Sequence, residues 1–254
     1  MAGRVYRNPR EAAEEVAGLL RQAKYAIALT GAGISADAGI PTFRGPGGLW
    51  EKYKPEELAT PEAFARDPLL VWRWYAWRIR MVLRASPTVS HMVLAKLEER
   101  GMLKAVITQN VDGLHQRAGS RNVIELHGNI LRARCTSCGY KWVLDKPPED
   151  RDLPLKCPRC GSLARPDVVW FGEPLPAEAL HRAIQEAARS DLVLVVGTSG
   201  VVEPAASIPL IAYERGARIV NINLEPNRYS PIAVVNYYGK AADFFAELEL
   251  VLGL

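Results

Sequence analysis

Four cysteines form two closely spaced pairs in one short segment. Cys135 and Cys138 make the first CxxC pair, and Cys157 and Cys160 make the second. Two thiolates three positions apart on a tight turn can face one ion, and two such turns complete a tetrahedron around zinc. Four sulfur ligands leave no open coordination position, so the spacing predicts a structural zinc ion. Redox-active dithiols are the weaker alternative, because a thioredoxin-like site needs only one CxxC motif.

A glycine-rich motif follows an apolar stretch near the start of the chain. Residues 31–36 read GAGISA directly after residues 25–30, which have the composition of a buried strand. Glycines at such a turn let backbone N–H groups approach a pyrophosphate at a helix start. The acidic residue usually found about twenty positions later is missing. Instead, Asn221, Asn223 and Glu225 stand at the end of a later predicted strand. The motif predicts a dinucleotide in an atypical pose, with a structural glycine turn as the alternative.

Amide and carboxylate side chains crowd the end of another apolar stretch, in the segment TQNVDGLH at residues 108–115. Gln109, Asn110 and Asp112 stand where open parallel sheets bind ligands, at the carboxyl end of a strand. Capping of a helix would explain either Asn110 or Asp112 but not all three residues. The segment therefore predicts ligand contacts.

The four histidines are candidate general bases, because an unperturbed imidazole titrates near pH 6.5. His127 ranks first, since it stands at a predicted strand end beside a glycine. His115 follows the amide cluster. His91 and His181 lie in helical patterns, which favours packing or surface roles.

Strands and helices alternate around these motifs. Short, mainly apolar stretches that are typical of buried strands lie at 25–30, 106–108, 123–126, 192–196 and 217–222. A helix capped by Asn8 opens the chain, and further helical patterns lie at 89–100, 177–189, 205–215 and 241–252. This order predicts an α/β fold with an open parallel sheet covered by helices on both faces. Two segments break the rhythm: a tryptophan-rich helical stretch at 45–86 and the cysteine segment at 132–165.

Composition excludes several classes of protein. The 254 residues are 48% hydrophobic and 24% charged, which excludes a disordered, collagen-like or coiled-coil chain. A net charge of +4 is too small for a concentrated nucleic-acid footprint. No apolar run approaches the roughly 20 residues that span a bilayer, and the N-terminus lacks an apolar export signal. We expect a cytoplasmic protein without membrane contact, because its few cysteines are confined to one metal-like motif.

Seven motifs occur in a fixed order: GAGISADAGIPTFRG, TQNVDGLHQRAGS, ELHG, the paired CxxC, RPDVVWFGE, GTSGVVEPAA and NIN. Together they resemble the sirtuin family, the NAD-dependent protein-lysine deacylases, over nearly the whole chain. The resemblance implies a Rossmann-like sheet domain and a smaller domain made of two insertions. The expected bounds are 1–44, 87–130 and 166–254 for the Rossmann-like domain, 45–86 for a helical module and 131–165 for the zinc module.

The resemblance also implies a mechanism and residue roles. The acyl-lysine oxygen attacks the sugar carbon that nicotinamide leaves, and the products are free lysine and O-acyl-ADP-ribose, with zinc taking no part. His127 would act as general base on the NAD ribose, while Asn110 and Ser35 hold the ribose and an ordered water. Asp112 and the Val111 backbone would bind the nicotinamide carboxamide. The full set of expected NAD contacts is Gly31, Ala32, Gly33, Asp37, Phe43, Arg44, Gln109, Val111, Asp112, Gly197, Thr198, Ser199, Asn223, Glu225 and Ala241.

The acyl-lysine protein or peptide would pair as a strand with Val168, Val169, Trp170, Phe171 and Gly172. Tyr75 and Arg78 are three positions apart in a helical pattern and therefore share one face. A phenol beside a guanidinium can bind a carboxylate, and this YxxR pattern resembles the sirtuin subgroup that removes succinyl and malonyl groups. An arginine packed over tryptophan on an aromatic helix face is the alternative.

Two other functions stay open. The same NAD cleavage could transfer ADP-ribose to a protein. A zinc-ribbon nucleic-acid-binding protein is the second, because the zinc segment is rich in basic residues: Arg132, Arg134, Lys141, Lys146, Lys156, Arg159 and Arg165. A chromatin- or DNA-associated protein is accordingly one class of target.

Overall fold

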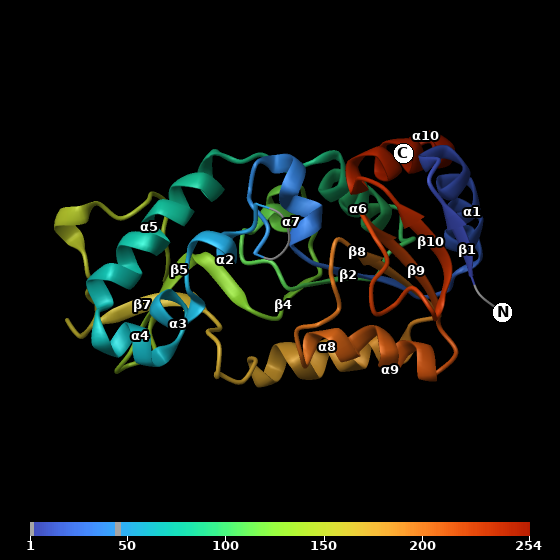
Figure 1. The fold of residues 1–254 in the computed structure, drawn as a ribbon. Helices are drawn as coiled ribbons and strands as arrows, with labels where there is room; N and C mark the ends of the chain where they lie inside the picture. The colour runs from blue at the N-terminus through green and yellow to red at the C-terminus, as the bar shows by residue number, and fades with distance from the viewer. Residues whose placement is uncertain (1–2, 44–46) are drawn as a thin grey trace.

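The computed structural model describes residues 3–43 and 47–254, and Arg44 lies outside this range. A seven-stranded sheet forms the larger half of the molecule (Figure 1). Its strands are all parallel and run in the order β1-β10-β9-β8-β2-β3-β4. Their bounds are β1 Arg4–Tyr6, β2 Ala26–Thr30, β3 Ala105–Thr108, β4 Val123–Glu125, β8 Leu192–Val196, β9 Arg218–Asn223 and β10 Ala233–Tyr238.

Helices cover both faces of this sheet (Figure 1). One face packs against α1 (Pro9–Gln22), α6 (Val89–Glu99) and α10 (Ala241–Leu252), and the other against α8 (Ala177–Arg189) and α9 (Ile208–Glu214). Within β2, Ala28 faces the first helical layer, while Ile27 and Leu29 face the second. Because both faces of the sheet are buried, the central strands β2 and β8 are buried at every position and do not alternate between apolar and polar residues. The predicted open parallel sheet is therefore confirmed.

The sheet reverses its winding between β2 and β8. From β2 the chain adds β3 and β4 on one side, whereas β8, β9 and β10 lie on the other. Open α/β sheets bind ligands at such a switch point, outside the carboxyl ends of the strands. The two loops that leave this point carry Gly31–Gly33 after β2 and Gly197–Ser199 after β8.

The two predicted insertions form the smaller domain at the left of Figure 1. The first contributes α2 (Leu49–Lys52), α3 (Pro55–Leu58), α4 (Pro61–Arg66) and α5 (Pro68–Arg84). The second contributes an antiparallel sheet of β5 (Gly128–Cys135), β6 (Lys141–Val143) and β7 (Ala164–Val168), with a short 3-10 turn, η2 (Asp150–Asp152). Both insertions share one apolar core, which includes Trp72 of α5, Ile130 of β5 and Trp170. The exact domain bounds stay a prediction.

Several elements differ from the sequence-based expectations. Strands β1 and β10 were not predicted, because β1 has only three residues and β10 interrupts its apolar pattern with the buried Asn236. The stretch expected as one helix at 205–215 begins with a 3-10 turn, η3 (Ala205–Ser207), before α9. The motif after β2 enters a 3-10 helix, η1 (Ala32–Ala38), rather than an α-helix. None of the helices in the described residues has the length and hydropathy needed to cross a membrane.

Candidate active site

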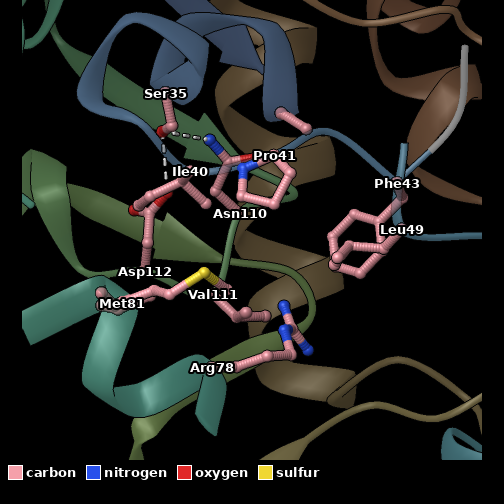
Figure 2. Close-up of a pocket in the computed structure, with 12 residues that line it drawn as sticks. Ser35, Ile40, Pro41, Phe43, Leu49, Arg78, Met81, Asn110, Val111 and Asp112 are labelled. Carbon is pink, nitrogen blue, oxygen red and sulfur yellow. Dashed lines mark hydrogen bonds between the residues drawn. The ribbon is translucent and has the colours of Figure 1, made fainter. Parts of the chain in front are cut away.

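A cavity of about 860 Å³ opens at the switch point and extends to the smaller domain. It is lined by most of the predicted NAD and substrate residues: Gly31, Ala32, Gly33, Asp37, Phe43, Tyr75, Arg78, Gln109, Asn110, Val111, His127, Val168, Val169, Trp170, Phe171, Gly172, Gly197, Thr198, Ser199, Asn223, Glu225 and Ala241. Ser35 and Asp112 line a smaller adjoining recess of about 20 Å³ (Figure 2). Residues far apart in the sequence are thus gathered around one space.

Close backbone contact explains the glycines of the first motif. A Cβ at Gly31 would lie 2.7 Å from the Gly197 carbonyl oxygen, and one at Gly33 would lie 2.7 Å from the Gly197 Cα. The Gly33 N–H donates to the Gly197 carbonyl at 2.9 Å. No side chain fits between these loops, so glycine is required where β2 and β8 deliver them to the cavity.

Ser35, Asn110 and Asp112 form a buried hydrogen-bonded cluster beside the cavity (Figure 2). The Ser35 hydroxyl donates to Asp112 Oδ2 at 2.7 Å, and Asn110 Nδ2 donates to Ser35 Oγ at 3.2 Å and to the Gly31 carbonyl at 3.0 Å. Asp112 Oδ1 also accepts the Leu114 N–H at 3.0 Å, in the turn that leads into α7 (Leu114–Arg117), but the N-cap residue of α7 is Gly113 and not Asp112. Burial raises the Asp112 pKa, and its hydrogen bonds oppose that shift.

Two histidines are buried behind this cluster. His91 and His115 have ring centroids 4.8 Å apart, and His91 Nε2 lies 3.4 Å from Ser35 Oγ. His91 also completes a capping box with Thr88 at the start of α6. The packing role expected for His91 therefore holds, and His115 takes the same role, while His181 is exposed on α8.

His127 follows β4 and borders the cavity. Its Nδ1 lies 2.9 Å from the Gln109 carbonyl oxygen, which can only accept a hydrogen bond. Nδ1 therefore carries the proton, and Nε2 keeps its lone pair. Burial lowers the His127 pKa, while the bond to Gln109 opposes this. The imidazole is thus held neutral near pH 7, with a basic nitrogen available.

An asparagine network supports the loop after β8. Asn223 Nδ2 and Asn227 Nδ2 both donate to the Thr198 carbonyl, at 2.6 and 2.7 Å. Gln109 Nε2 donates to Thr198 Oγ1 at 3.0 Å, so three amides hold one threonine. Asn227 also bonds to the fully buried Asn221 at 3.0 Å. Asn227 is not among the site residues predicted from the sequence. Its position two residues after Glu225, in a polar loop, could have indicated that it lines the cavity.

Tyr75 and Arg78 of α5 lie on one buried face, as their spacing predicts, and are 2% and 7% exposed. The Arg78 guanidinium stacks 4.9 Å from the Phe43 ring centroid and 4.8 Å from that of Trp74. Within the described part of the chain, no carboxylate lies within ion-pair distance of Arg78. Burial lowers the pKa of Arg78, and the neighbouring Tyr75 hydroxyl and then the charge of Asp112 oppose that shift.

The segment Val168–Gly172 passes along the cavity after β7. Its backbone is already bonded within the protein: the Trp170 N–H donates to Glu173 Oε2 at 2.8 Å, and the Phe171 N–H donates to the Ala59 carbonyl at 3.0 Å. These bonds fix the shape of the segment on its inner side. Its pairing with a peptide strand stays a prediction.

The four cysteines meet at one point of the smaller domain. All four sulfurs lie within 4.8 Å of one another, and the Cys138–Cys157 pair is 3.8 Å apart. Zinc with Zn–S bonds near 2.3 Å requires a tetrahedron with edges of about 3.8 Å, so the cluster fits a zinc ion. Backbone N–H groups of Ser137 and Cys138 point at Cys135 Sγ, as they do toward a thiolate. The cluster is absent from the cavity lining, which agrees with a structural ion.

Several basic residues of the zinc segment are neutralised by carboxylates. Arg132 and Lys141 each reach the buried Asp167 at 3.1 Å, and Arg165 pairs with Glu173 at 2.5 Å. Cations that are bonded inside the protein are not free to bind phosphates. This arrangement weakens the nucleic-acid-binding alternative.

Comparison with known proteins agrees with this geometry. The Sir2 family model matches residues 31–204. The NAD-dependent protein deacylase 2 of Pyrobaculum aerophilum is 61% identical over 233 residues, which cover 92% of this chain and 93% of that protein. The NAD-dependent protein deacylase of Aeropyrum pernix is 56% identical over 244 residues, 96% of this chain and 99% of that protein.

Solved structures give the same result. A Sir2 homologue in complex with NAD superposes with a TM-score of 0.88 at 52% identity, covering 94% of this chain and 93% of that one. A Sir2 variant with a deacetylated p53 peptide and 3′-O-acetyl-ADP-ribose gives 0.87 at 40% identity, covering 95% and 98%. The family resemblance expected from the motifs is confirmed by sequence and by fold, and the chain belongs to the Sir2 family.

Proposed function

We propose that this Sir2-family chain is an NAD-dependent protein-lysine deacylase that removes the acidic succinyl and malonyl groups as well as acetyl. The deacylase class follows from the family and from the relatives that carry this name. The substrate is an acyl-lysine in a protein or peptide, as the p53 peptide in a similar structure illustrates. A chromatin- or DNA-associated target stays a prediction.

His127 is the proposed general base. NAD supplies a sugar carbon that becomes electrophilic as nicotinamide departs. His127 Nε2 has the free lone pair to take a proton from a ribose hydroxyl, because Nδ1 is committed to the Gln109 carbonyl. Its lowered pKa keeps the basic form dominant at neutral pH. The chain therefore supports proton transfer without a metal ion in the cavity.

The polar cluster and the asparagine network are proposed to position NAD. Asn110 and Ser35 would hold the ribose and a water, and Asp112 with the Val111 backbone would hold the nicotinamide amide. Thr198 and Asn223, already bonded to each other, would hold the far end of the dinucleotide. Fixed donors of this kind lower the barrier because they need no reorganisation during reaction.

The buried charge of Arg78 is the observation that carries the acidic-acyl proposal. A guanidinium that is 7% exposed and surrounded by aromatic rings has lost most of its hydration. Leaving such a cation without an anion is costly, so an anionic ligand would bind there strongly. A succinyl or malonyl carboxylate at the end of the lysine chain is such an anion. An arginine that merely packs on aromatic rings would keep its head group in water.

The test is a set of lysine peptides, unmodified, acetylated, malonylated and succinylated, incubated with and without NAD and analysed by mass spectrometry. We expect NAD-dependent loss of all three acyl groups. Arg78→Met should lower kcat/KM for the succinyl peptide by about 30-fold or more, the value of one buried charge contact, and leave acetyl removal nearly unchanged. The matched control is Arg80→Met, on the same helix but 42% exposed and loosely paired with Asp150.

The possible results distinguish removal of acidic acyl groups from ADP-ribose transfer and from a structural role of Arg78. Loss of acetyl alone in the wild type would refute the acidic-acyl proposal and keep the deacylase class. A gain of mass on the unmodified peptide, with no acyl loss from any other, would favour ADP-ribose transfer. An equal loss of both activities in Arg78→Met would indicate a structural role for Arg78.

A further inference from the structure

Trp170 connects the substrate segment to the acyl pocket. Its side chain is 3% exposed, and its Nε1 lies 2.9 Å from the Tyr75 hydroxyl oxygen. The two residues are 95 positions apart, so the contact exists only in the folded chain. Their rings are tilted by 50° with centroids 6.4 Å apart, so the hydrogen bond, and not ring stacking, is the specific link.

The donor and acceptor roles in this contact are fixed by chemistry. An indole N–H can only donate, so the Tyr75 oxygen must accept. Arg78, which also hydrogen-bonds to this hydroxyl, is likewise only a donor. No acceptor for the Tyr75 proton is found among the described residues. The hydroxyl proton is therefore left to donate to a ligand in the cavity, which Tyr75 and Arg78 both line.

Trp170 is itself rigidly held. The Arg165 guanidinium lies 3.4 Å from the centroid of the indole, and its two terminal nitrogens bind Glu173 at 2.5 and 2.8 Å. Glu173 in turn accepts the Trp170 backbone N–H at 2.8 Å. A bidentate pair of this kind fixes orientation as well as position. Both the ring and the backbone of Trp170 are thus set before any ligand arrives.

We propose that Trp170 is a specificity-determining positioning residue that acts through Tyr75. By occupying the phenol oxygen as acceptor, its indole N–H orients the hydroxyl as a donor toward the carboxylate of an acidic acyl group, beside the Arg78 cation. The inference rests on the proposed removal of succinyl and malonyl groups. It adds that a residue outside the YxxR pair sets the acyl preference.

The direct test is Trp170→Phe, which keeps an aromatic ring and deletes the N–H donor. We expect the ratio of kcat/KM for succinyl over acetyl peptide to fall about tenfold, the effect of one misoriented hydrogen bond to a charge. Trp72→Phe is the matched control, because Trp72 is equally buried on α5 and donates to the Ala164 carbonyl at 2.8 Å. That variant should leave the ratio unchanged.

A double-mutant cycle separates positioning from packing. In a Tyr75→Phe background the hydroxyl is gone, so adding Trp170→Phe should not lower the ratio further. A full additional loss there, or an equal fall of both activities in Trp170→Phe alone, would overturn the inference. If Trp170→Phe does not fold, Glu173→Gln must lower the same ratio by a smaller factor, and an unchanged ratio refutes the proposal.

Assays of the wild-type chain distinguish a failure of the proposed function from a failure of the inference about Trp170. A wild-type chain that removes acetyl but neither succinyl nor malonyl refutes the acidic-acyl proposal, and this inference with it. A wild-type chain that removes all three, with a Trp170→Phe ratio equal to that of Trp72→Phe, refutes this inference alone.

Discussion

Two buried charged side chains, Asp112 and Arg78, border the same recess but have different kinds of neighbours (Figure 2). Asp112 accepts hydrogen bonds from the Ser35 hydroxyl and the Leu114 N–H. Arg78 faces the rings of Phe43, Trp74 and Tyr75. The carboxylate accepts hydrogen bonds from its own chain, whereas the guanidinium has aromatic neighbours and no carboxylate partner among the described residues. We infer that the first region serves the reaction common to all substrates and the second selects among them.

The strongest change that we expect is in how the free energy of unfolding depends on pH, and it comes from the two histidines buried beside the Ser35–Asp112 cluster. Burial lowers the pKa of His91 to about 4 and that of His115 to about 3. Stability from these neutral imidazoles is present above the unfolded pKa of about 6.5 and is lost as pH falls toward the folded values. We expect the free energy of unfolding to drop by about 3–4 kcal/mol between pH 7 and pH 5, measured by urea denaturation.

A variant checks the source of that drop. His115→Gln removes one titrating group and should halve the pH dependence. The groups facing the pair, Thr30, Ser35 and Thr88, do not titrate in this range. Asp112, reached through Ser35, has a raised pKa and acts in the opposite direction. The Arg78 guanidinium stays charged over this pH range. An equal drop in the free energy of unfolding in wild type and His115→Gln would therefore show that His115 is not its source.

The second effect is on activity. Asp112→Ala removes the acceptor of both the Ser35 hydroxyl and the Leu114 N–H, so the polar cluster that we propose binds NAD loses its order. We expect kcat/KM to fall about 100-fold, or about 2.7 kcal/mol, for acetyl and succinyl peptides alike. A change in the ratio of kcat/KM for the succinyl peptide over the acetyl peptide would contradict the inference that Asp112 serves a reaction common to all substrates.

The weakest change that we expect is in the free energy of unfolding when the buried charge of Arg78 is removed. Arg78 has no carboxylate partner among the described residues. Replacing this buried cation by methionine in Arg78→Met should raise the free energy of unfolding by about 1 kcal/mol, because methionine carries no charge that folding must desolvate. In a chain of this length that corresponds to about 2–4 °C in Tm by calorimetry. Arg80→Met is again the control and should change Tm little. A fall in Tm for Arg78→Met would mean that Arg78 supports the fold.

Local signals predicted the elements well. Helix α1 begins after Asn8, whose side chain accepts the N–H groups of Arg10 and Glu11, as its cap position indicates. Helix α8 and strand β8 have the predicted bounds, since each is marked by a pattern within a few residues. Strand β10 was missed because Asn236 is buried by pairing with Asn221 from β9, a contact that no local pattern records.

Local sequence patterns were enough to predict the metal ligands and the glycine turn, because paired CxxC motifs and a GAG after an apolar strand each favour a particular local geometry. The seven motifs in order were enough to predict the family. The contacts between these residues and distant segments depend on the tertiary structure. The Gln109 carbonyl selects the His127 tautomer, and Trp170 makes Tyr75 an acceptor from a position 95 residues away. The packing of α5 surrounds Arg78 with aromatic rings and, within the described residues, with no carboxylate at ion-pair distance. Hydrogen bonds and charges between distant segments depend on how the elements pack, and spacing along the chain does not encode that.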